Sequence, residues 1–332
     1  MDLDKFYKIF KDKPGYRLRQ AKKAVFQELI DNWDDATTLP EKLRKDLSKE
    51  CPLSIHSKLF HSRSSPTIKA LVILKDGNRV ETVLMKHKEG RNTVCVSSQV
   101  GCKLGCKFCA TGAMGFIRDL KWHEIIEQVV IFSRILKMEK QKVTNVVFMG
   151  MGEPFLNYDN VIEAVKCLND KEGFNIGSRK ISVSTVGIVP GIYKLAREPL
   201  QVNLAISFHA PNDKLRSRLM PVNKKYPLKE VLKAVDSYIA DTNRKVMFEY
   251  IMLKGVNDDL KLAKELADLL KGKLCMVNLI PCNEVCRFTP SDKKRIKSFI
   301  EILKRSKIEV VQRYSFGQDI DAACGQLANR SI

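Results

Sequence analysis

The chain has 332 residues, and its 58 Lys and Arg side chains outnumber its 38 Asp and Glu side chains to give a formal net charge of +20. A chain of this length with 44% hydrophobic residues can bury a core without disulfide bonds, and its composition excludes a disordered polymer. No run of about 18 apolar residues occurs and the first residues lack the apolar stretch of a signal peptide, so we expect a cytoplasmic protein without a membrane span.

The first 70 residues predict a small helical region, which a β-hairpin follows. Apolar residues within 17–33 recur at the spacing of one helix face. A second helix is expected after Pro40, because proline is favoured at the start of a helix. Residues 68–85 have an extended pattern that contains Asp-Gly-Asn at 76–78, a sequence typical of a hairpin turn.

From about residue 93, short β-branched runs alternate with amphipathic stretches. The predicted strands are Thr93–Val96, Asn145–Met149, Ile181–Ser184, Val202–Phe208, Lys245–Met252 and Met276–Ile280. The predicted helices are Trp122–Leu136, Val161–Leu168, Leu228–Ile239, Leu260–Leu270 and Asp292–Leu303. This alternation is typical of parallel βα units, and about six of them predict an α/β fold with a closed or partial barrel. A last run, Ile308–Tyr314, can pair as one more strand.

Three cysteines, Cys102, Cys106 and Cys109, follow the first predicted barrel strand in a C-x₃-C-x₂-C pattern. The chain has ten cysteines, and in a reducing cytosol these favour metal ligation or redox chemistry over disulfide bonds. Three thiolates so close together can hold a cubane iron–sulfur cluster and leave one iron open to a substrate or cofactor. The alternative is a zinc site with His123 as the nearest histidine downstream, but the cysteine spacing is unusual for zinc and we favour the cluster.

The cysteine motif resembles the signature of the radical S-adenosylmethionine (radical SAM) superfamily, and further words along the chain narrow the resemblance. These words are CVSSQVGC at 95–102, FMGMGEPFLN at 148–157, SFHAPND at 207–213 and DIDAACGQL at 319–327. Together they resemble the RlmN branch of the RlmN/Cfr family of radical SAM RNA methyltransferases, from about residue 70 onward. The resemblance implies a radical SAM partial (βα)₆ barrel with a small N-terminal helical domain and a C-terminal extension that carries a catalytic cysteine.

The resemblance also implies a radical route to methylation of C2 of an adenine in RNA. One S-adenosylmethionine methylates Cys324, and a second is cleaved at the open iron of a [4Fe-4S] cluster held by Cys102, Cys106 and Cys109. The radical so formed takes hydrogen from the methyl group, the methyl carbon adds to the base, and Cys95 resolves the protein–RNA adduct with formation of a disulfide bond. From the residues alone, a buried core thiol is the better interpretation of Cys95, whereas the polar residues and glycine around Cys324 are typical of an exposed loop.

Residues near the ends of several predicted strands match the family's cofactor-contact positions. They are Gly152, Glu153, Ser184, Ser207, Phe208, His209 and Asn283. Taken singly, a polar residue of this kind could be a turn or capping residue. Their shared position favours an active site, because barrel active sites gather at the C-terminal strand ends. The resemblance makes Glu153 the expected partner of the cofactor's ammonium group.

A glutamate is the expected general base that removes the C2 proton. Glu81, in the word Val-Glu-Thr-Val at 80–83, matches the family's base, although its spacing to Cys95 is slightly longer than the family pattern. Glu89 is the competing candidate, and an ordinary exposed surface residue is the remaining alternative for Glu81.

Cys282 and Cys286 form a C-x₃-C pair, with Cys275 close by, that is not typical of the family. They either hold a second cluster or have no ligand role, and we favour the second alternative because a loop beside the active site has little room for a cluster. Cys51 and Cys167 fall on apolar helix faces and are predicted to be core residues.

The excess positive charge fits either a solvated surface or a nucleic-acid-binding surface, and the resemblance favours RNA. The expected contacts are Lys11, Lys13, Arg17, Arg19, Lys22 and Lys23 near the N-terminus and Lys214, Arg216, Arg218, Lys224 and Lys225 after His209. The implied targets are a peptidyl-transferase-centre adenosine of 23S rRNA and an anticodon-loop adenosine of tRNA, since a loop base is the least costly to unstack. An electron donor such as flavodoxin or ferredoxin is the other implied partner, and we expect a monomer.

The predicted domains are a helical RNA-binding accessory domain over 1–70, an extended linker or hairpin over 71–92, a radical SAM core barrel over 93–305, and a C-terminal strand and catalytic-cysteine loop over 306–332. Two rival functions remain open. One is a Cfr-type methyltransferase that acts on C8 of the same ribosomal adenosine, although the word at 153–157 resembles the RlmN branch more. The other is a non-catalytic iron–sulfur or zinc protein that binds RNA, which would have no use for a Cys95–Cys324 pair.

Overall fold

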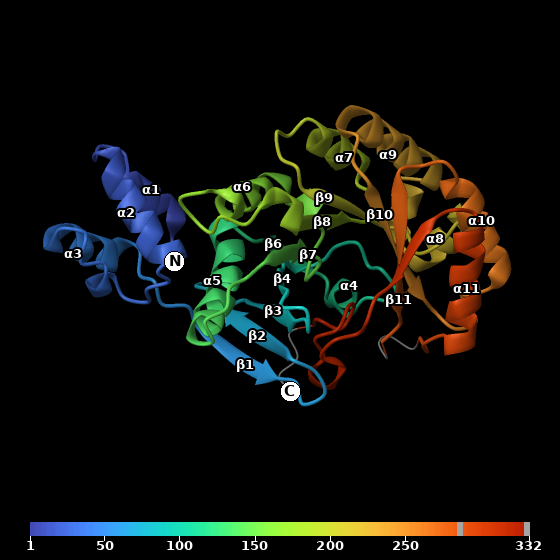
Figure 1. Cartoon of the computed structure of the whole chain (residues 1–332), viewed down its shortest axis with the longest axis horizontal. Coiled ribbons are helices and arrows are strands. Elements are labelled where there is room, and N and C mark those ends of the chain that lie inside the picture. Colours follow the sequence, from blue (N-terminus) through green and yellow to red (C-terminus); the bar gives the residue numbers. More distant parts are fainter. Residues whose placement is uncertain (284–287, 329–332) are drawn as a thin grey trace.

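The computed structural model describes residues 1–283 and 288–328, and the predicted helical region lies at one end of an elongated molecule (Figure 1). Helices α1 (Leu3–Phe10), α2 (Gly15–Phe26) and α3 (Glu41–Glu50) form this region. Their small core contains Phe6 and Trp33, whose rings stack with centroids 6.0 Å apart. The Trp33 indole donates a hydrogen bond to the carbonyl of Cys51 over 2.7 Å, which ties the end of α3 to this core.

Two features of this region differ from the prediction. The helix expected over 17–33 ends at Phe26, because Leu29 takes a positive φ of 56° and Asn32 starts a separate helical turn by accepting a hydrogen bond from Asp34. Helix α1 and strand β1 (Ser57–His61) are absent from the predicted elements. Eight and five residues are too few for a periodic pattern to stand out.

A ten-stranded sheet forms the centre of the molecule, in the order β1-β2-β3-β4-β7-β8-β9-β10-β11-β12. Strands β1, β2 (Thr67–Ile73) and β3 (Arg79–Lys86) are antiparallel, and β2 and β3 form the predicted hairpin. Strand β4 (Asn92–Cys95) pairs antiparallel with β3 and parallel with β7, so it joins the hairpin to the strands of the barrel.

Within this sheet the strands β4, β7 and their neighbours through β12 are parallel, which confirms the predicted α/β fold with a large parallel sheet. The strands after β4 are β7 (Asn145–Phe148), β8 (Ile181–Thr185), β9 (Asn203–Ser207), β10 (Val246–Met252), β11 (Cys275–Pro281) and β12 (Glu309–Gln312). The helices between them are α5 (Trp122–Met138), α6 (Tyr158–Asn169), α7 (Val189–Ala196), α8 (Asp213–Leu219), α9 (Leu228–Thr242), α10 (Leu260–Leu270) and α11 (Lys293–Arg305). In the described residues β1 and β12 are the two edges of the sheet, so the barrel is open.

Helix α5 connects the helical region to the sheet. Most of its residues are buried, because it packs on the sheet and also meets the N-terminal helices. The Trp122 indole donates to Asp4 of α1 over 2.8 Å, and the Arg134 guanidinium donates to the carbonyls of Ile30 and Leu53. These contacts hold the helical region against one side of the barrel.

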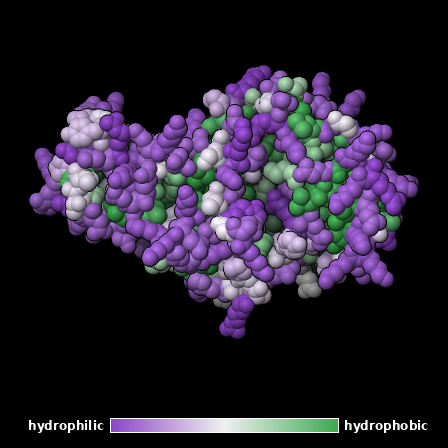
Figure 2. Space-filling model, viewed as in Figure 1, coloured by the Kyte–Doolittle hydropathy of each residue, from purple (hydrophilic) through white to green (hydrophobic). Residues whose placement is uncertain are grey.

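After β12 the chain turns back toward β2 and β3 (Figure 1). We call residues 313–328 the C-terminal segment. The Arg313 amide donates to the carbonyl of Leu279 over 2.8 Å, and the Gly317 amide donates to the Ser65 hydroxyl over 3.0 Å. The segment therefore runs from the β11 side of the open barrel to the β1–β2 connection. Hydrophilic side chains cover most of the face seen in Figure 2, and among the described residues no helix combines the length and apolar character of a membrane span.

Candidate active site

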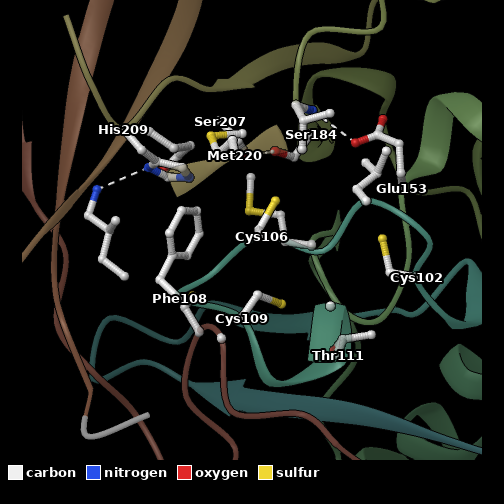
Figure 3. A pocket seen from close by; sticks show the side chains of 18 of the residues that line it. Cys102, Cys106, Phe108, Cys109, Thr111, Glu153, Ser184, Ser207, His209 and Met220 are labelled. Atoms are coloured by element: carbon white, nitrogen blue, oxygen red, sulfur yellow. Dashed lines mark hydrogen bonds between the residues drawn. The ribbon is translucent and has the colours of Figure 1, made fainter. Parts of the chain in front are cut away.

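Three cysteines from one loop line a cavity at the carboxyl ends of the parallel strands (Figure 3). The loop follows β5 (Gln99–Gly101), which pairs with β6 (Phe116–Asp119), and it leads into the short helix α4 (Ala110–Met114). Gly101 has a φ of +76°, and a Cβ at this position would lie 2.0 Å from the carbonyl oxygen of Gly115, so only glycine fits. The Cys102 amide donates to the same carbonyl over 2.7 Å, which fixes the start of the loop.

The thiols of Cys102, Cys106 and Cys109 are partly buried and belong to the lining of the cavity, which measures about 960 Å³ with its open mouth. Burial raises the pKa of Cys102 to about 11 and also raises that of Cys106, and nearby negative charge adds to both shifts. Thiolates in this place therefore need a neighbouring cation. Three converging thiols with this requirement fit an iron–sulfur cluster held by three cysteines.

His123 has no part in this cysteine site. It lies in the first turn of α5, where its Nε2 is 3.9 Å from a carboxylate oxygen of Asp4 in the helical region. It is not among the residues that line the cavity. The zinc alternative, which needed His123 as a further ligand, therefore has no support in the described structure.

Gly152 and Glu153 form the part of the cavity wall that follows β7. A Cβ at Gly152, whose φ is +99°, would lie 2.5 Å from the side chain of Gln99, so the backbone can pack this closely against Gln99 only with glycine. The Glu153 carboxylate accepts hydrogen bonds from the amides of Val186 over 2.8 Å and Phe155 over 3.0 Å. Burial raises the pKa of Glu153 to about 7, although these hydrogen bonds favour its ionised form. A cation placed in the cavity, such as an ammonium group, would favour ionisation further.

Ser184, Ser207 and His209 face the thiols from the ends of β8 and β9 (Figure 3). The hydroxyl oxygens of Ser184 and Ser207 are 3.4 Å apart. His209 has a φ of +60°, and its Nδ1 accepts a hydrogen bond from the Ile251 amide over 3.1 Å. Burial lowers the pKa of His209 to about 3, so its imidazole is neutral. This side of the cavity therefore offers neutral polar groups.

Two predicted cofactor residues lie beside the cavity lining rather than in it. The Phe208 ring is fully buried against Phe248, with centroids 5.2 Å apart. Asn283 is also buried, and its side-chain nitrogen donates to the backbone carbonyl of Cys324 over 3.2 Å while its oxygen accepts from Gln318 over 2.6 Å. Asn283 therefore supports the Cys324 loop, and a cofactor contact by either residue stays a prediction.

Cys324 brings a further thiol to the same cavity from the C-terminal segment. It is exposed, and the adjacent Gly325 accepts a hydrogen bond on its carbonyl from the Ala110 amide over 2.8 Å. Cys95, at the end of β4, is partly buried, and both thiols are free. Burial and, to a smaller extent, the negative charge of a Cys324 thiolate raise the pKa of Cys95 to about 12.

Glu81 is fully buried in β3 and is not among the residues that line the cavity. One carboxylate oxygen lies 3.0 Å from the Lys69 ammonium, and the other accepts a hydrogen bond from the Ala328 amide over 2.8 Å. The alternative of an exposed surface residue is therefore wrong for Glu81. Glu89 is the exposed one: 63% of its side chain is accessible, and it pairs with Arg91 at the surface.

The cavity also contains an ion pair that the sequence reasoning missed. Arg313 and Glu249 both line the cavity, with the guanidinium 3.3 Å from the carboxylate, and Asn278 donates to the same carboxylate oxygen over 2.8 Å. Glu249 sits in the middle of a buried strand, which is an unusual place for a carboxylate. That position, together with Arg313 at the end of the last predicted strand, was the signal available in the sequence.

Arg216, predicted as an RNA contact, is fully buried, so that prediction is wrong. Its guanidinium donates to the backbone carbonyls of Val186 over 2.5 Å and Phe208 over 3.1 Å, and to the Asn223 side chain over 2.8 Å. Arg216 thus holds the ends of β8 and β9 together. The other basic residues predicted after His209 are exposed: Lys214, Arg218, Lys224 and Lys225.

Cys275 and Cys282 cannot share a second cluster. Cys275 begins β11 and Cys282 directly follows its last residue, so they are seven residues apart, which corresponds to about 23 Å along a strand. Both thiols are buried, and Cys286 lies outside the described residues. Cys51 and Cys167 are buried core residues, as predicted.

The open parallel barrel and its three-cysteine loop define a radical SAM enzyme. In agreement, the family model of the Radical SAM superfamily matches residues 96–267. The "Probable dual-specificity RNA methyltransferase RlmN" of Dictyoglomus turgidum is 48% identical over 95% of this chain and 90% of its own length. The relative of the same name from Dictyoglomus thermophilum is 46% identical over 98% of this chain and 94% of its own length.

A solved structure shows the same fold over the whole described chain. The crystal structure of a radical SAM methyltransferase from Sphaerobacter thermophilus superposes with a TM-score of 0.95 at 45% identity, and the match covers 99% of this chain and 98% of that one. The chain belongs to the RlmN branch of the RlmN/Cfr family, and it is an S-adenosylmethionine-dependent RNA methyltransferase of the radical type. Its cofactors are a [4Fe-4S] cluster and S-adenosylmethionine.

Proposed function

We propose that this enzyme methylates C2 of an adenine in both 23S rRNA and tRNA, by way of a methyl group carried on Cys324 and a covalent protein–RNA adduct. One observation carries the proposal: the exposed thiol of Cys324 lines the same cavity as Cys102, Cys106 and Cys109, although more than 200 residues separate it from them. A methyl-carrying thiol needs this proximity, because hydrogen abstraction requires the reacting atoms to be nearly in contact. The dual-specificity names of the relatives support the two kinds of RNA.

The residues of the cavity divide between the two cofactors. Cys102, Cys106 and Cys109 hold the cluster. Gly152, Glu153, Ser184, Ser207, Phe208, His209 and Asn283 hold S-adenosylmethionine, with Glu153 as the partner of its ammonium group. When bound, the two cofactors supply a one-electron route to remove hydrogen from an unreactive methyl group. A reductant of the flavodoxin or ferredoxin class supplies the electron.

Cys95 and Glu81 complete the reaction in this proposal. After the Cys324 methyl carbon joins the base, the adduct loses one electron, for which the oxidised cluster would be the acceptor, and Glu81 accepts the C2 proton. The Cys95 thiol gives up its proton and its sulfur attacks the Cys324 sulfur, so the bond between the Cys324 sulfur and the carbon breaks. That carbon takes up a proton, the methylated base is released and a Cys95–Cys324 disulfide remains. The reducing cytosol, where we place the enzyme, restores both thiols.

The helical region over residues 1–70 serves as the RNA-binding accessory domain, beside the hairpin over 71–92, the barrel over 93–305 and the catalytic-cysteine part over 306–332. Support comes from its basic surface, on which Lys11, Lys13, Arg19 and Lys23 are exposed. Lys22 contributes less, because it pairs with Asp170 over 2.6 Å. We propose that the enzyme acts as a monomer.

The test is to weigh the Cys324 peptide of protein reconstituted with the cluster under anaerobic conditions, before and after addition of S-adenosylmethionine. A gain of one methyl group on Cys324, and none on the buried Cys167, is the expected result. C324A should methylate no RNA, whereas C95A should accumulate a covalent protein–RNA species. The matched control C167A should keep wild-type activity.

Nucleoside analysis of 23S rRNA and tRNA treated with the enzyme then identifies the product. Methylation at C2 in both RNAs supports the proposal. Methylation at C8 would assign the Cfr-type reaction, and an unmodified Cys324 with active enzyme would exclude a methyl-carrying thiol. Cluster-loaded protein that binds RNA and transfers no methyl group would point to the non-catalytic alternative.

A further inference from the structure

A completely enclosed ion pair lies in the β2–β3 hairpin, outside the cavity. The Lys69 ammonium of β2 is 3.0 Å from a Glu81 carboxylate oxygen of β3, and the side chains are 0% and 1% exposed. The register pairs Lys69 with Val83 and Val83 with Cys95. Directly paired residues of antiparallel strands point to the same face, and so do residues two positions apart in one strand, such as Glu81 and Val83. Lys69, Glu81 and Cys95 therefore share one face of the sheet.

The C-terminal segment runs close to the β2–β3 hairpin (Figure 1) and uses Glu81 as an attachment point. The second Glu81 oxygen accepts the amide hydrogen of Ala328 over 2.8 Å. Next to it, the Thr111 hydroxyl donates to the carbonyl of Leu327 over 2.6 Å. Both contacts lie three or four residues after Cys324, so they hold the segment on the C-terminal side of the thiol.

The segment is also held on the other side of Cys324. Asp319 accepts hydrogen bonds from the hydroxyls of Ser62 over 2.7 Å and Ser64 over 2.8 Å, and from the Arg63 amide over 2.8 Å. The exposed thiol is therefore within a span that is fastened on both sides, and the carbonyls of Cys324 and Gly325 are also held, by Asn283 and Ala110. Release of the Glu81 fastening would loosen the C-terminal side of this span and give Cys324 more freedom.

Lys69 makes the Glu81 fastening strong. The Lys69 ammonium lies 3.0 Å from the other Glu81 oxygen, and a carboxylate held in an ion pair binds an amide hydrogen more strongly than a neutral acceptor does. A buried ion pair adds little to the free energy of unfolding compared with apolar residues of the same volume. The role of this pair is therefore the hydrogen bond that Glu81 accepts from the Ala328 amide.

We propose that Lys69 and Glu81 anchor the C-terminal segment to the sheet and thereby position the Cys324 thiol in the cavity. Lys69 is a positioning residue in this arrangement, since it acts through Glu81. The inference rests on the proposed function only for the role of Cys324, and the position of the thiol can be measured without methyl transfer.

The test compares two anchor variants with a matched control in cluster-loaded protein without S-adenosylmethionine or RNA. K69M/E81M replaces the pair by apolar side chains of similar length, which preserves packing. A328P removes the amide hydrogen, with a ring that also fixes φ at residue 328, and leaves the Lys69–Glu81 pair in place. The control E41M/K45M removes an exposed pair of the same chemistry, in which the charged atoms are 2.7 Å apart.

Amide hydrogen exchange over 317–328 and the rate of Cys324 alkylation by iodoacetamide are measured for each protein by peptide mass spectrometry. Both anchor variants should exchange and alkylate about tenfold faster or more, the effect of losing one hydrogen bond to a charged group, while the control stays at the wild-type rates. Unchanged exchange and alkylation in A328P would overturn the anchor. If K69M/E81M does not fold, A328P decides the question by itself.

The result is independent of the proposed function. Faster alkylation of Cys324 in A328P, in a protein whose Cys324 never becomes methylated, would support the anchor and refute the methyl carrier. Methylation of Cys324 by S-adenosylmethionine, together with an unchanged rate of Cys324 alkylation in A328P, would support the methyl carrier and refute the anchor.

Discussion

The Arg313 guanidinium lies 3.3 Å from the Glu249 carboxylate in the wall of the cavity that Cys324 also lines. Glu249 is almost completely buried, and burial raises its pKa, while Arg313 and Asn278 favour its ionised form. The pair joins β10 to the start of the C-terminal segment, so the wall of the cavity and the segment that contains Cys324 are fastened together.

R313M should lower the free energy of unfolding by about 1–3 kcal/mol, because it leaves the buried Glu249 without its cation. Adding E249Q should recover part of this loss, since a neutral amide can keep the hydrogen bond from Asn278. Urea unfolding of the two single variants and the double variant, in cluster-free protein, measures the coupling. Additive effects of the two substitutions would show that the pair contributes nothing.

The neutral His209 should make the stability of the cluster-free protein depend on pH. Its folded pKa is about 3 against 6.5 in the unfolded chain, so between these values the unfolded state binds a proton that the folded state does not. Stability is therefore lost as the pH falls through this window, with a slope of up to about 1.4 kcal/mol per pH unit.

H209N should flatten that slope, because asparagine offers an acceptor to the Ile251 amide, tolerates a positive φ and does not titrate. Urea unfolding at several pH values between 7 and 4.5 measures the difference. Equal slopes in wild type and H209N would mean that His209 takes up a proton in the folded protein.

G101A should prevent assembly of the cluster site, since the new methyl group would lie 2.0 Å from the carbonyl oxygen of Gly115. Iron content and cluster absorbance after anaerobic reconstitution should fall to a small fraction of the wild-type values. G105A is the matched control: Gly105 is in the same loop with a φ of +63°, and a Cβ there meets nothing within 4 Å. It should keep most of its iron, and equal losses in the two variants would refute the steric explanation.

Much of the fold could be predicted because long periodic segments carry their own pattern. The predicted helix over 260–270 agrees with α10 at both ends, and each predicted barrel strand agrees with a strand of the structure to within one residue at either end. Helices α7 and α8 were not predicted, because each has eight residues or fewer and α7 begins with a Val-Pro-Gly sequence that resembles a turn.

The site was predictable where its residues lie in contiguous words, as for the cysteine loop and the end of β7. The rest depends on contacts that no local pattern contains. Arg216 belongs to a basic run in the sequence, yet it is buried because the carbonyls at the ends of two strands need a donor. The contact between Glu81 and Ala328 joins residues 247 positions apart, so only the folded chain shows it.

The exposed basic residues of α8 and the turn after it should bind RNA. Helix α8 lies beside the cluster loop, as the Lys107 amide donates to the carbonyl of Leu219 over 2.9 Å and Met220 lines the cavity. We therefore expect K214A/R218A/K224A/K225A to bind an RNA hairpin with a target adenosine more weakly. The salt dependence of RNA binding by this variant is the slope of the log of the association constant against the log of the salt concentration. This slope should become shallower by about 0.7 for each RNA phosphate that the variant no longer neutralises.

The control removes the same four charges at the opposite end of the barrel, where the parallel strands begin: K271A/K304A/R305A/K307A. These residues are exposed as well, so the net charge changes equally while the surface near the cavity stays intact. RNA affinity should remain close to that of the wild type. Equal weakening in both variants would mean that the RNA responds to the overall charge of the enzyme rather than to a surface beside the active site.

R216K should leave RNA affinity unchanged for a given amount of folded protein and should instead lower the free energy of unfolding, because the planar set of hydrogen bonds made by the buried guanidinium is lost.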